Sequence, residues 1–253
     1  MTTAAIVAII LGTCLAGFVQ GVSGFAFGLV AMSVWAWTID PQLAGPMVVW
    51  GSWVGQILSL GALRGGLLWR RAVPFVIGGA AGVPLGAWVL KYIDIGVFKG
   101  CVGVVLMGYC STMLFASRIP TIRRGGPILD GMVGAVGGVM GGIGGLTGPA
   151  PTLWCTLRGW DRTAQRSVFQ VFNLSMHSLT LTVYYLNGTL TAAMAPIFAL
   201  IVPVAVVPTL LGVLVYRRVD ERMFRRVVLV LLLGSGITLV VSSLVGHART
   251  PTG

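Results

Sequence analysis

Two glycine-rich stretches hold the residue types best suited to binding a ligand. They share the spacing GxxxGxxGxxxG, which occurs at Gly17, Gly21, Gly24 and Gly28 and again, 120 residues later, at Gly137, Gly141, Gly144 and Gly148. Ser23 and Thr147 add hydroxyl groups beside the two stretches. Pro149 suits the first turn of a helix, where no backbone N–H is needed.

A glycine-rich break in an apolar helix is suited to binding an anion. It exposes the first N–H groups and the positive dipole end of the helix that follows, and anions bind at such helix ends. Glycine also lets a ligand approach the backbone closely. We therefore predict an anion site framed by Ser23, Gly24, Gly28, Gly144, Gly145, Thr147 and Pro149. The competing interpretation is that GxxxG spacing only packs helices together.

A polar stripe supports the same site. Arg166, Gln170, Asn173 and His177 recur at i, i+4, i+7 and i+11, which places them on one helix face. Polar side chains within membrane spans face protein or water, so Gln170, Asn173 and His177 are predicted to line the site. Hydrogen bonding between helices is the alternative. A milder stripe lies in the first half, at Ser52, Gln56 and Ser59.

The ionisable residues favour an anion over a cation. His177 is a candidate proton carrier, because an imidazole titrates near neutral pH. Asp40, Asp94 and Asp130 flank the apolar segments instead of lying within them. We expect neither a carboxylate proton relay nor a cation site. The four cysteines lie in apolar stretches without a CxxC pair, so we expect no disulfide framework, no metal and no cofactor.

The elements that position these residues are membrane helices. Of the 253 residues, 56% are hydrophobic and 9% are charged, against about 25% charged in a soluble domain. One crossing takes about 20 apolar residues. The charge-free runs 41–63, 72–90, 100–117 and 227–248 each fit one crossing, and 167–216 fits two crossings divided at Asn187. The runs 1–39 and 131–157 are read as pairs of helical arms around a break, and the first is not expected to be a cleaved signal.

The basic residues orient these helices. If the segments alternate in direction, one side collects 14 of the 17 basic residues. These are Arg64, Arg70, Arg71, Arg118, Arg123, Arg124, Arg158, Arg162, Arg166, Arg217, Arg218, Arg222, Arg225 and Arg226. The other side has Lys91, Lys99 and Arg249. The positive-inside rule makes the first side cytoplasmic and puts both termini outside. Topology thus explains the net charge of +11, and no nucleic-acid partner is expected.

The chain also reads as two repeats, 1–126 and 127–253. A second block recurs with a spacing of 126 residues. Its first copy consists of Gly86, Val89, Lys91, Asp94, Phe98, Lys99 and Gly108. The second copy consists, in the same order, of Gly212, Val215, Arg217, Asp220, Phe224, Arg225 and Gly234. Each half holds a broken pair plus three spans, and this odd count inverts the second half relative to the first. Such inverted-topology repeats are found in many secondary transporters.

At the duplicated segments 17–28 and 137–151 the sequence resembles the sulfite exporter TauE/SafE family, also called TSUP. The similarity spans nearly the whole chain. It implies transport of a small sulfur-containing or organic anion, such as sulfite, sulfoacetate or another sulfonate, across a bacterial inner membrane, in either direction. Alternating access around the two breaks is the expected mechanism. The first half departs from the pattern, because 23–27 is bulkier than 141–145.

Two alternatives compete with a transporter. Gly21-Val22-Ser23-Gly24 matches the GxSG of rhomboid intramembrane proteases, in which Ser23 would be the nucleophile and His177 its base. The motif is short, and the matching position in the second half is Ile143. The other alternative is a membrane scaffold subunit. We predict a transporter without enzymatic activity, which contacts the lipid bilayer and a small anion, with protons as the candidate coupling ion.

Overall fold

The computed structural model describes residues 3–60, 68–122, 125–215 and 221–249, and these are almost entirely helical. The first half contains α1 (Thr3–Ser23), α2 (Phe27–Trp35), α3 (Pro41–Leu60), α4 (Trp69–Tyr92), α5 (Ile95–Phe115) and the 3-10 turn η1 (Ala116–Arg118). The second contains α6 (Pro127–Gly144), α7 (Pro149–Leu157), α8 (Arg162–Leu186), η2 (Ala192–Met194), α9 (Ala195–Val215) and α10 (Glu221–Arg249). The all-helical fold is confirmed. Arg64, Arg123, Arg124, Arg217, Arg218 and Asp220 lie outside the described residues.

Six of the described helices are long and apolar enough to cross a membrane. They are α1, α4, α5, α6, α9 with η2, and α10. Large apolar side chains such as Ile77, Leu214 and Leu231 are exposed on their outer faces, as expected where lipid replaces water. The two remaining long helices, α3 and α8, carry the buried polar stripes and pack against each other inside the bundle. The protein is therefore a multi-pass membrane protein.

Aspartates begin three of the helices. Asp40 accepts from the Gln42 N–H at 2.8 Å, Asp94 from the Gly96 N–H at 2.7 Å, and Asp161 from the Ala164 N–H at 2.9 Å. Each carboxylate satisfies an N–H group that has no partner within its own helix. These acidic residues therefore serve as helix caps.

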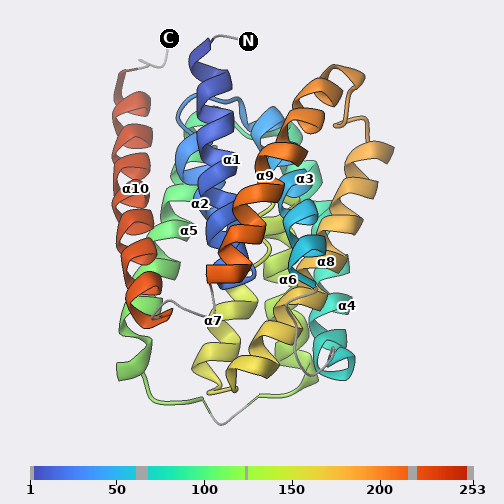
Figure 1. Ribbon diagram of the computed structural model, residues 1–253, viewed down its shortest axis with the longest axis vertical. Coiled ribbons are helices and arrows are strands. Elements are labelled where there is room, and N and C mark those ends of the chain that lie inside the picture. The colour runs from blue at the N-terminus through green and yellow to red at the C-terminus, as the bar shows by residue number, and fades with distance from the viewer. Residues whose placement is uncertain (1–2, 61–67, 123–124, 216–220, 250–253) are drawn as a thin grey trace.

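Both broken pairs fold back as hairpins. The Trp35 indole, at the end of α2, donates to the Ala8 carbonyl near the start of α1 at 3.0 Å. The Trp154 indole of α7 donates to Asp130, near the start of α6, at 2.7 Å. Hairpin 1 (3–35) and hairpin 2 (127–157) therefore each enter and leave at one end of the bundle. They enter from opposite ends, and both chain termini lie at the end of hairpin 1 (Figure 1).

One helix of each half packs along the hairpin of the other half. Helix α4 lies along α6, and α9 lies along α1. Glycines allow both contacts: a Cβ on Gly82 would collide with the Ala135 carbonyl of α6, and a Cβ on Gly212 with the Phe18 carbonyl of α1. A Cβ on Gly21 would collide with Thr209, so this part of the first glycine motif does pack helices. The two contacts are equivalent under the predicted pairing of the halves, and the repeat, with its boundary at 126/127, stays a prediction.

Candidate functional site

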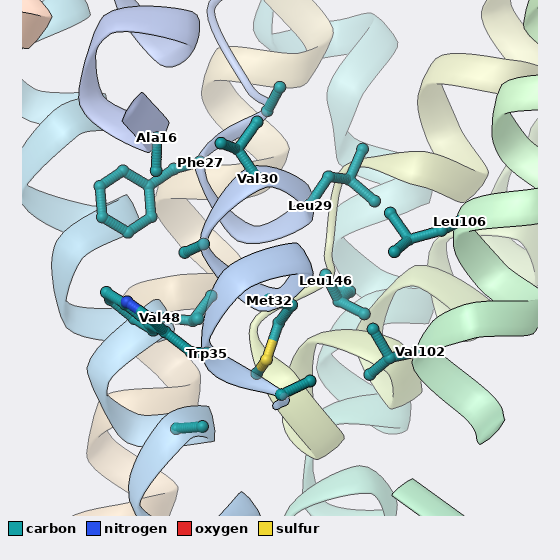
Figure 2. Close-up of a cluster of buried hydrophobic side chains, with 14 of the residues drawn as sticks. Ala16, Phe27, Leu29, Val30, Met32, Trp35, Val48, Val102, Leu106 and Leu146 are labelled. Carbon is teal, nitrogen blue, oxygen red and sulfur yellow. The ribbon is translucent and has the colours of Figure 1, made fainter. Parts of the chain in front are cut away.

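The tips of the two hairpins meet inside the bundle. Tip 1 is the break 24–26 between α1 and α2, and tip 2 is the break 145–148 between α6 and α7. A Cβ on Gly28 would lie 2.8 Å from the Gly145 carbonyl oxygen, and a Cβ on Gly148 would lie 3.0 Å from the Phe25 ring. Figure 2 shows the buried Leu146 of tip 2 beside Met32 of α2. The predicted residues of the two breaks are thus brought together.

One glycine in each tip requires its lack of a side chain. Gly24 has φ +86° and Gly145 has φ +70°, a left-handed conformation that glycine adopts without strain. Each ends the long arm of its hairpin: the Gly24 N–H donates to the Gln20 carbonyl, and the Gly145 N–H to the Gly141 carbonyl. The two glycines are 121 residues apart. The repeated glycine spacing in the sequence pairs Gly24 with Gly144, whereas the shared left-handed conformation pairs Gly24 with Gly145.

Tip 1 differs from the prediction that its N–H groups are available to a ligand. The Phe25 and Ala26 N–H groups lie 3.4 and 3.3 Å from Ser23 Oγ, which accepts from both. The Phe27 N–H donates to Gln20 Oε1 at 3.1 Å. The helix end is capped by its own chain because Gln20 lies within one turn of the break. Gln20 was missed, although a buried glutamine in an apolar helix is a readable signal.

Tip 2 forms a polar cluster with α8. The Thr147 hydroxyl donates to Asn173 Oδ1 at 2.8 Å and lies 3.3 Å from His177 Nε2. A hydroxyl has one proton, so while Thr147 donates to Asn173, only the His177 tautomer protonated at Nε2 can form a hydrogen bond with the same hydroxyl. Asn173 Nδ2 and His177 Nδ1 find no hydrogen-bond partner among the described residues. The three predicted side chains therefore lie together. Asn173 Nδ2 is a donor, and His177 Nδ1 an acceptor, that no described residue satisfies.

The other predicted residues play structural parts. Pro149 occupies the first turn of α7, as predicted, and together with Pro151 it removes two N–H groups from that turn. The Gln170 amide donates to the Gln56 carbonyl of α3 at 2.6 Å, and the Gln56 amide donates to the Gly24 carbonyl at 3.1 Å. Gln170 thus supports tip 1 through α3. Gly144 packs against Met32 and Phe98.

A cavity of about 330 Å³ lies beside tip 1. Its lining comes from hairpin 1, α5, α7, α8, α10 and the turn that contains Trp160. Arg166 is the only charged side chain among the described lining residues. A Cβ on Gly24 would lie 3.6 Å from Arg166 Nε, so the guanidinium is close to the tip. Of the predicted site residues, Ser23 lines this cavity. Arg166 was assigned to topology, although it begins the predicted stripe.

The two polar stripes match each other position by position. Ser52, Gln56 and Ser59 of α3 precede Asn173, His177 and Thr180 of α8 by 121 residues each. All six side chains are buried, and each has one polar atom without a partner among the described residues. Asp40 and Asp161, the caps of α3 and α8, have the same spacing. At this spacing Gly45 matches Arg166, so the cation occurs in the second half only.

The geometry does not support the protease alternative. The Ser23 hydroxyl donates to the Val19 carbonyl at 2.7 Å and caps tip 1. His177 contacts Thr147 instead. Within the described part of the chain, neither side chain is a hydrogen-bond partner of the other. A serine nucleophile needs its base within hydrogen-bond reach.

The comparisons with known proteins agree with the helical architecture. The family model of the sulfite exporter TauE/SafE family matches residues 9–239 of the 253-residue chain. No curated protein and no solved structure matches the chain. The family match covers hairpin 1 from residue 9 onward, hairpin 2, α3 to α5, α8, α9 and most of α10. The chain therefore belongs to the sulfite exporter TauE/SafE family of membrane transporters.

Proposed function

We propose that this protein carries a small sulfur-containing or organic anion, such as sulfite, sulfoacetate or another sulfonate, across the bacterial inner membrane. The position of Arg166 carries the proposal: this arginine lines the cavity beside tip 1. A guanidinium in a low-dielectric site attracts an anion far more strongly than it would in water. It also suits the planar or trigonal oxygens of carboxylates and sulfonates.

The hydroxyl groups around Arg166 extend the same chemistry. Ser23, Thr152 and Thr156 line the cavity with it, together with the amide of Gln165. The Ser23 and Thr156 hydroxyls donate to the Val19 and Thr152 carbonyls. The Thr152 hydroxyl has no hydrogen-bond partner among the described residues, so it is the neutral hydroxyl donor for an oxyanion. Asp130, the carboxylate of hairpin 2, is held by Arg158 at 3.3 Å and by Trp154. It is therefore not positioned to repel an anion in the cavity.

Alternating access supplies the proposed mechanism. A second recess, of about 410 Å³, is lined by Gln42, Lys91 and Thr189, at the end of the bundle where the termini lie. The buried stripes of α3 and α8 run through the bundle interior. A buried polar atom without a partner costs about 1–3 kcal/mol, and opening toward the second recess would let solvent or substrate satisfy those atoms. In the state that is open toward the second recess, the transport route would be lined by Thr147, Asn173 and His177. In the state described by the structure, tip 1 lines the route.

The distribution of arginines supports a direction for the two proposed openings. Helices α4, α6 and α8 begin at the end away from the termini (Figure 1), and Arg70 and Arg71 lie in the first turn of α4. By the positive-inside rule that end is cytoplasmic. The cavity at Arg166 would then load from the cytoplasm, and both termini would face outward. The inverted repeats 1–126 and 127–253 would provide the two equivalent gates.

A flux measurement tests the proposal. The purified protein is reconstituted into vesicles, and uptake of sulfite, sulfoacetate, other sulfonates and carboxylates is followed with and without a pH gradient. We expect saturable flux of at least one anion, which Arg166→Gln lowers at least tenfold, while Arg118→Gln, an exposed arginine outside the cavity, has no effect. Stimulation by a pH gradient would make His177 the first proton carrier to test. Flux no higher than in protein-free vesicles for every anion would refute transport.

A further inference from the structure

Helix α3 holds hairpin 1 beside its tip by two buried hydrogen bonds. The Gln56 amide donates to the Gly24 carbonyl at 3.1 Å, and the Gln20 amide donates to the Ser52 carbonyl at 3.1 Å. The two helices approach closely here, since a Cβ on Gly55 would lie 2.5 Å from Gln20 Nε2. All three polar side chains are buried. The position of α3 therefore determines where the first break lies.

Helix α8 holds tip 2 from the equivalent positions. Asn173 accepts from the Thr147 hydroxyl at 2.8 Å, and His177 Nε2 lies 3.3 Å from the same oxygen. Asn173 lies 121 residues after Ser52. His177 lies 121 residues after Gln56. Matching turns of α3 and α8 therefore each hold the break of their own half.

Two hydrogen bonds join α3 to α8. The Gln170 amide donates to the Gln56 carbonyl at 2.6 Å, and the Trp53 indole donates to Ser178 Oγ at 3.0 Å. Among the described residues Gln170 Oε1 has no hydrogen-bond partner, so the Gln170 side chain bonds to α3 and to neither tip. A chain of hydrogen bonds thus runs from tip 1 through Gln56 and Gln170 to the helix that holds tip 2.

We infer that α3 and α8 form one frame that couples the positions of the two tips, with Gln56 and His177 as its equivalent tip-holding residues. Breaking a buried hydrogen bond is costly because no water replaces the lost partner. The α3–α8 frame therefore moves as a unit, and a displacement of one tip shifts the other. Such coupling acts equally in both directions. The tips also touch directly at Gly28 and Gly145, so the experiment must separate these two routes.

Hydrogen–deuterium exchange of the full-length protein in vesicles measures both tips at once. The reporters are hydrogen-bonded N–H groups, Phe25 and Phe27 at tip 1 and Gly145 and Leu146 at tip 2. Gln170→Met removes the donor that links α8 to α3. We expect about fivefold faster exchange at both tips, because fivefold is about 1 kcal/mol, the usual net contribution of one hydrogen bond. Unchanged exchange at one or both tips would overturn the inference.

Thr182→Ala is the matched control for the loss of a polar side chain from α8. The Thr182 hydroxyl donates to the Ser178 carbonyl within the same helix, so its removal should leave both tips unchanged. Faster exchange at both tips in Thr182→Ala as well would show that the link to α3 is not the cause, and the inference would fail. If size-exclusion profiles show that Gln170→Met does not fold, Ser178→Ala cuts the second link in its place.

Variants at each tip separate the frame from the direct contact. Gln56→Met releases tip 1, and Thr147→Val releases tip 2. We expect each variant to speed exchange at least twofold at the opposite tip, in addition to its own. In a double-mutant cycle this effect on the opposite tip should disappear once Gln170→Met is present. If it keeps its full size there, the coupling passes through the touching tips, and the α3–α8 frame has no part in it.

A conservative replacement tests the equivalence of the two tip-holding residues. A glutamine amide at position 177 presents an N–H donor, as the Nε2–H of His177 does. We expect His177→Gln to keep exchange at tip 2 within twofold of the unmodified protein, whereas His177→Leu speeds it about fivefold. Equal loss of protection in both variants would contradict the equivalence with Gln56. None of these measurements requires a transported solute, so failure of the inference is distinct from failure of the proposed function.

Discussion

Two small groups of side chains would carry the binding chemistry. Arg166 provides charge in the cavity at tip 1, and Thr147, Asn173 and His177 form a hydrogen-bonded cluster at tip 2. The first group acts through charge, and the second through directed hydrogen bonds. If alternating access holds, each group faces solvent in a different state, so variants in the two groups should affect different steps of transport.

Asn173→Leu tests the cluster at tip 2. The substitution removes the acceptor of the Thr147 hydroxyl, so a buried donor loses its partner at a cost of about 1–3 kcal/mol. We expect vesicle flux to fall about tenfold while the amount of protein inserted in the membrane is unchanged. Thr182→Ala, on the exposed face of α8, is the control. Unaltered flux in Asn173→Leu would remove this residue from the site.

Gly24→Ala tests the left-handed backbone conformation at tip 1. The left-handed conformation, with φ +86°, costs an alanine about 1–2 kcal/mol. Space does not limit the change, because the nearest atom to the new Cβ belongs to Arg166 at 3.6 Å. We expect a lower Tm in detergent and reduced flux. Gly234→Ala, which meets no atom within 4 Å on a helix, should leave the Tm equal or higher. If Gly234→Ala lowered the Tm as much as Gly24→Ala does, the left-handed conformation of Gly24 would not explain the loss of stability.

Among the elements, the two hairpins differ in how they end. Hairpin 1 caps its returning arm with the side chains of Gln20 and Ser23. Hairpin 2 begins its returning arm with Pro149 and Pro151, which need no N–H partner. Each tip therefore satisfies its backbone by a different means, as a helix break inside a membrane protein must. This difference leaves side chains, and not bare N–H groups, as the main contacts for an anion.

Gly28→Ala tests the contact between the hairpins. The new Cβ would lie 2.8 Å from the Gly145 carbonyl oxygen and 3.2 Å from Val48, so the tips must move apart. Alanine fits the helical backbone of Gly28, so any effect comes from this contact. We expect flux to fall at least tenfold while helix content measured by circular dichroism is unchanged. Full flux in Gly28→Ala would show that close approach of the tips is dispensable for transport.

For the molecule as a whole, the inverted relation of the two halves is the central prediction. Exchanged packing of α4 on α6 and of α9 on α1 supports it. So do the matching polar atoms at a spacing of 121 residues in α3 and α8. Inversion would explain how one chain builds two gates that face opposite sides of the membrane.

Cysteine accessibility tests this inversion. Single cysteines are placed at Lys91 and at its predicted mate Arg217, which lies outside the described residues, in a background without Cys14, Cys101, Cys110 and Cys155. We expect an impermeant thiol reagent to label the Lys91 position from outside intact cells and the Arg217 position only after the membrane is opened. Labelling of both positions from the same side would exclude inverted repeats.

Much of the architecture was readable from the sequence. Charge-free runs near 20 residues determined the helices, because a charge inside a bilayer is costly and a span has a fixed length. The glycine spacing located both breaks, since helix interiors disfavour glycine unless a turn or close packing requires it. The stripe on α8 was predicted from its period, and Thr147, Asn173 and His177 do meet.

Only the tertiary structure decided how the breaks are used. Sequence periodicity cannot distinguish an arm that crosses from one that folds back, because both are short apolar helices; the contacts of Trp35 and Trp154 identify hairpins. The position of Arg166 beside the cavity was likewise hidden, since a juxtamembrane arginine has the same sequence context whether it faces lipid headgroups or a cavity. Its proximity to Gly24 depends on packing between residues 142 positions apart. Local patterns determine helices, whereas a site between helices depends on which faces the folded bundle brings together.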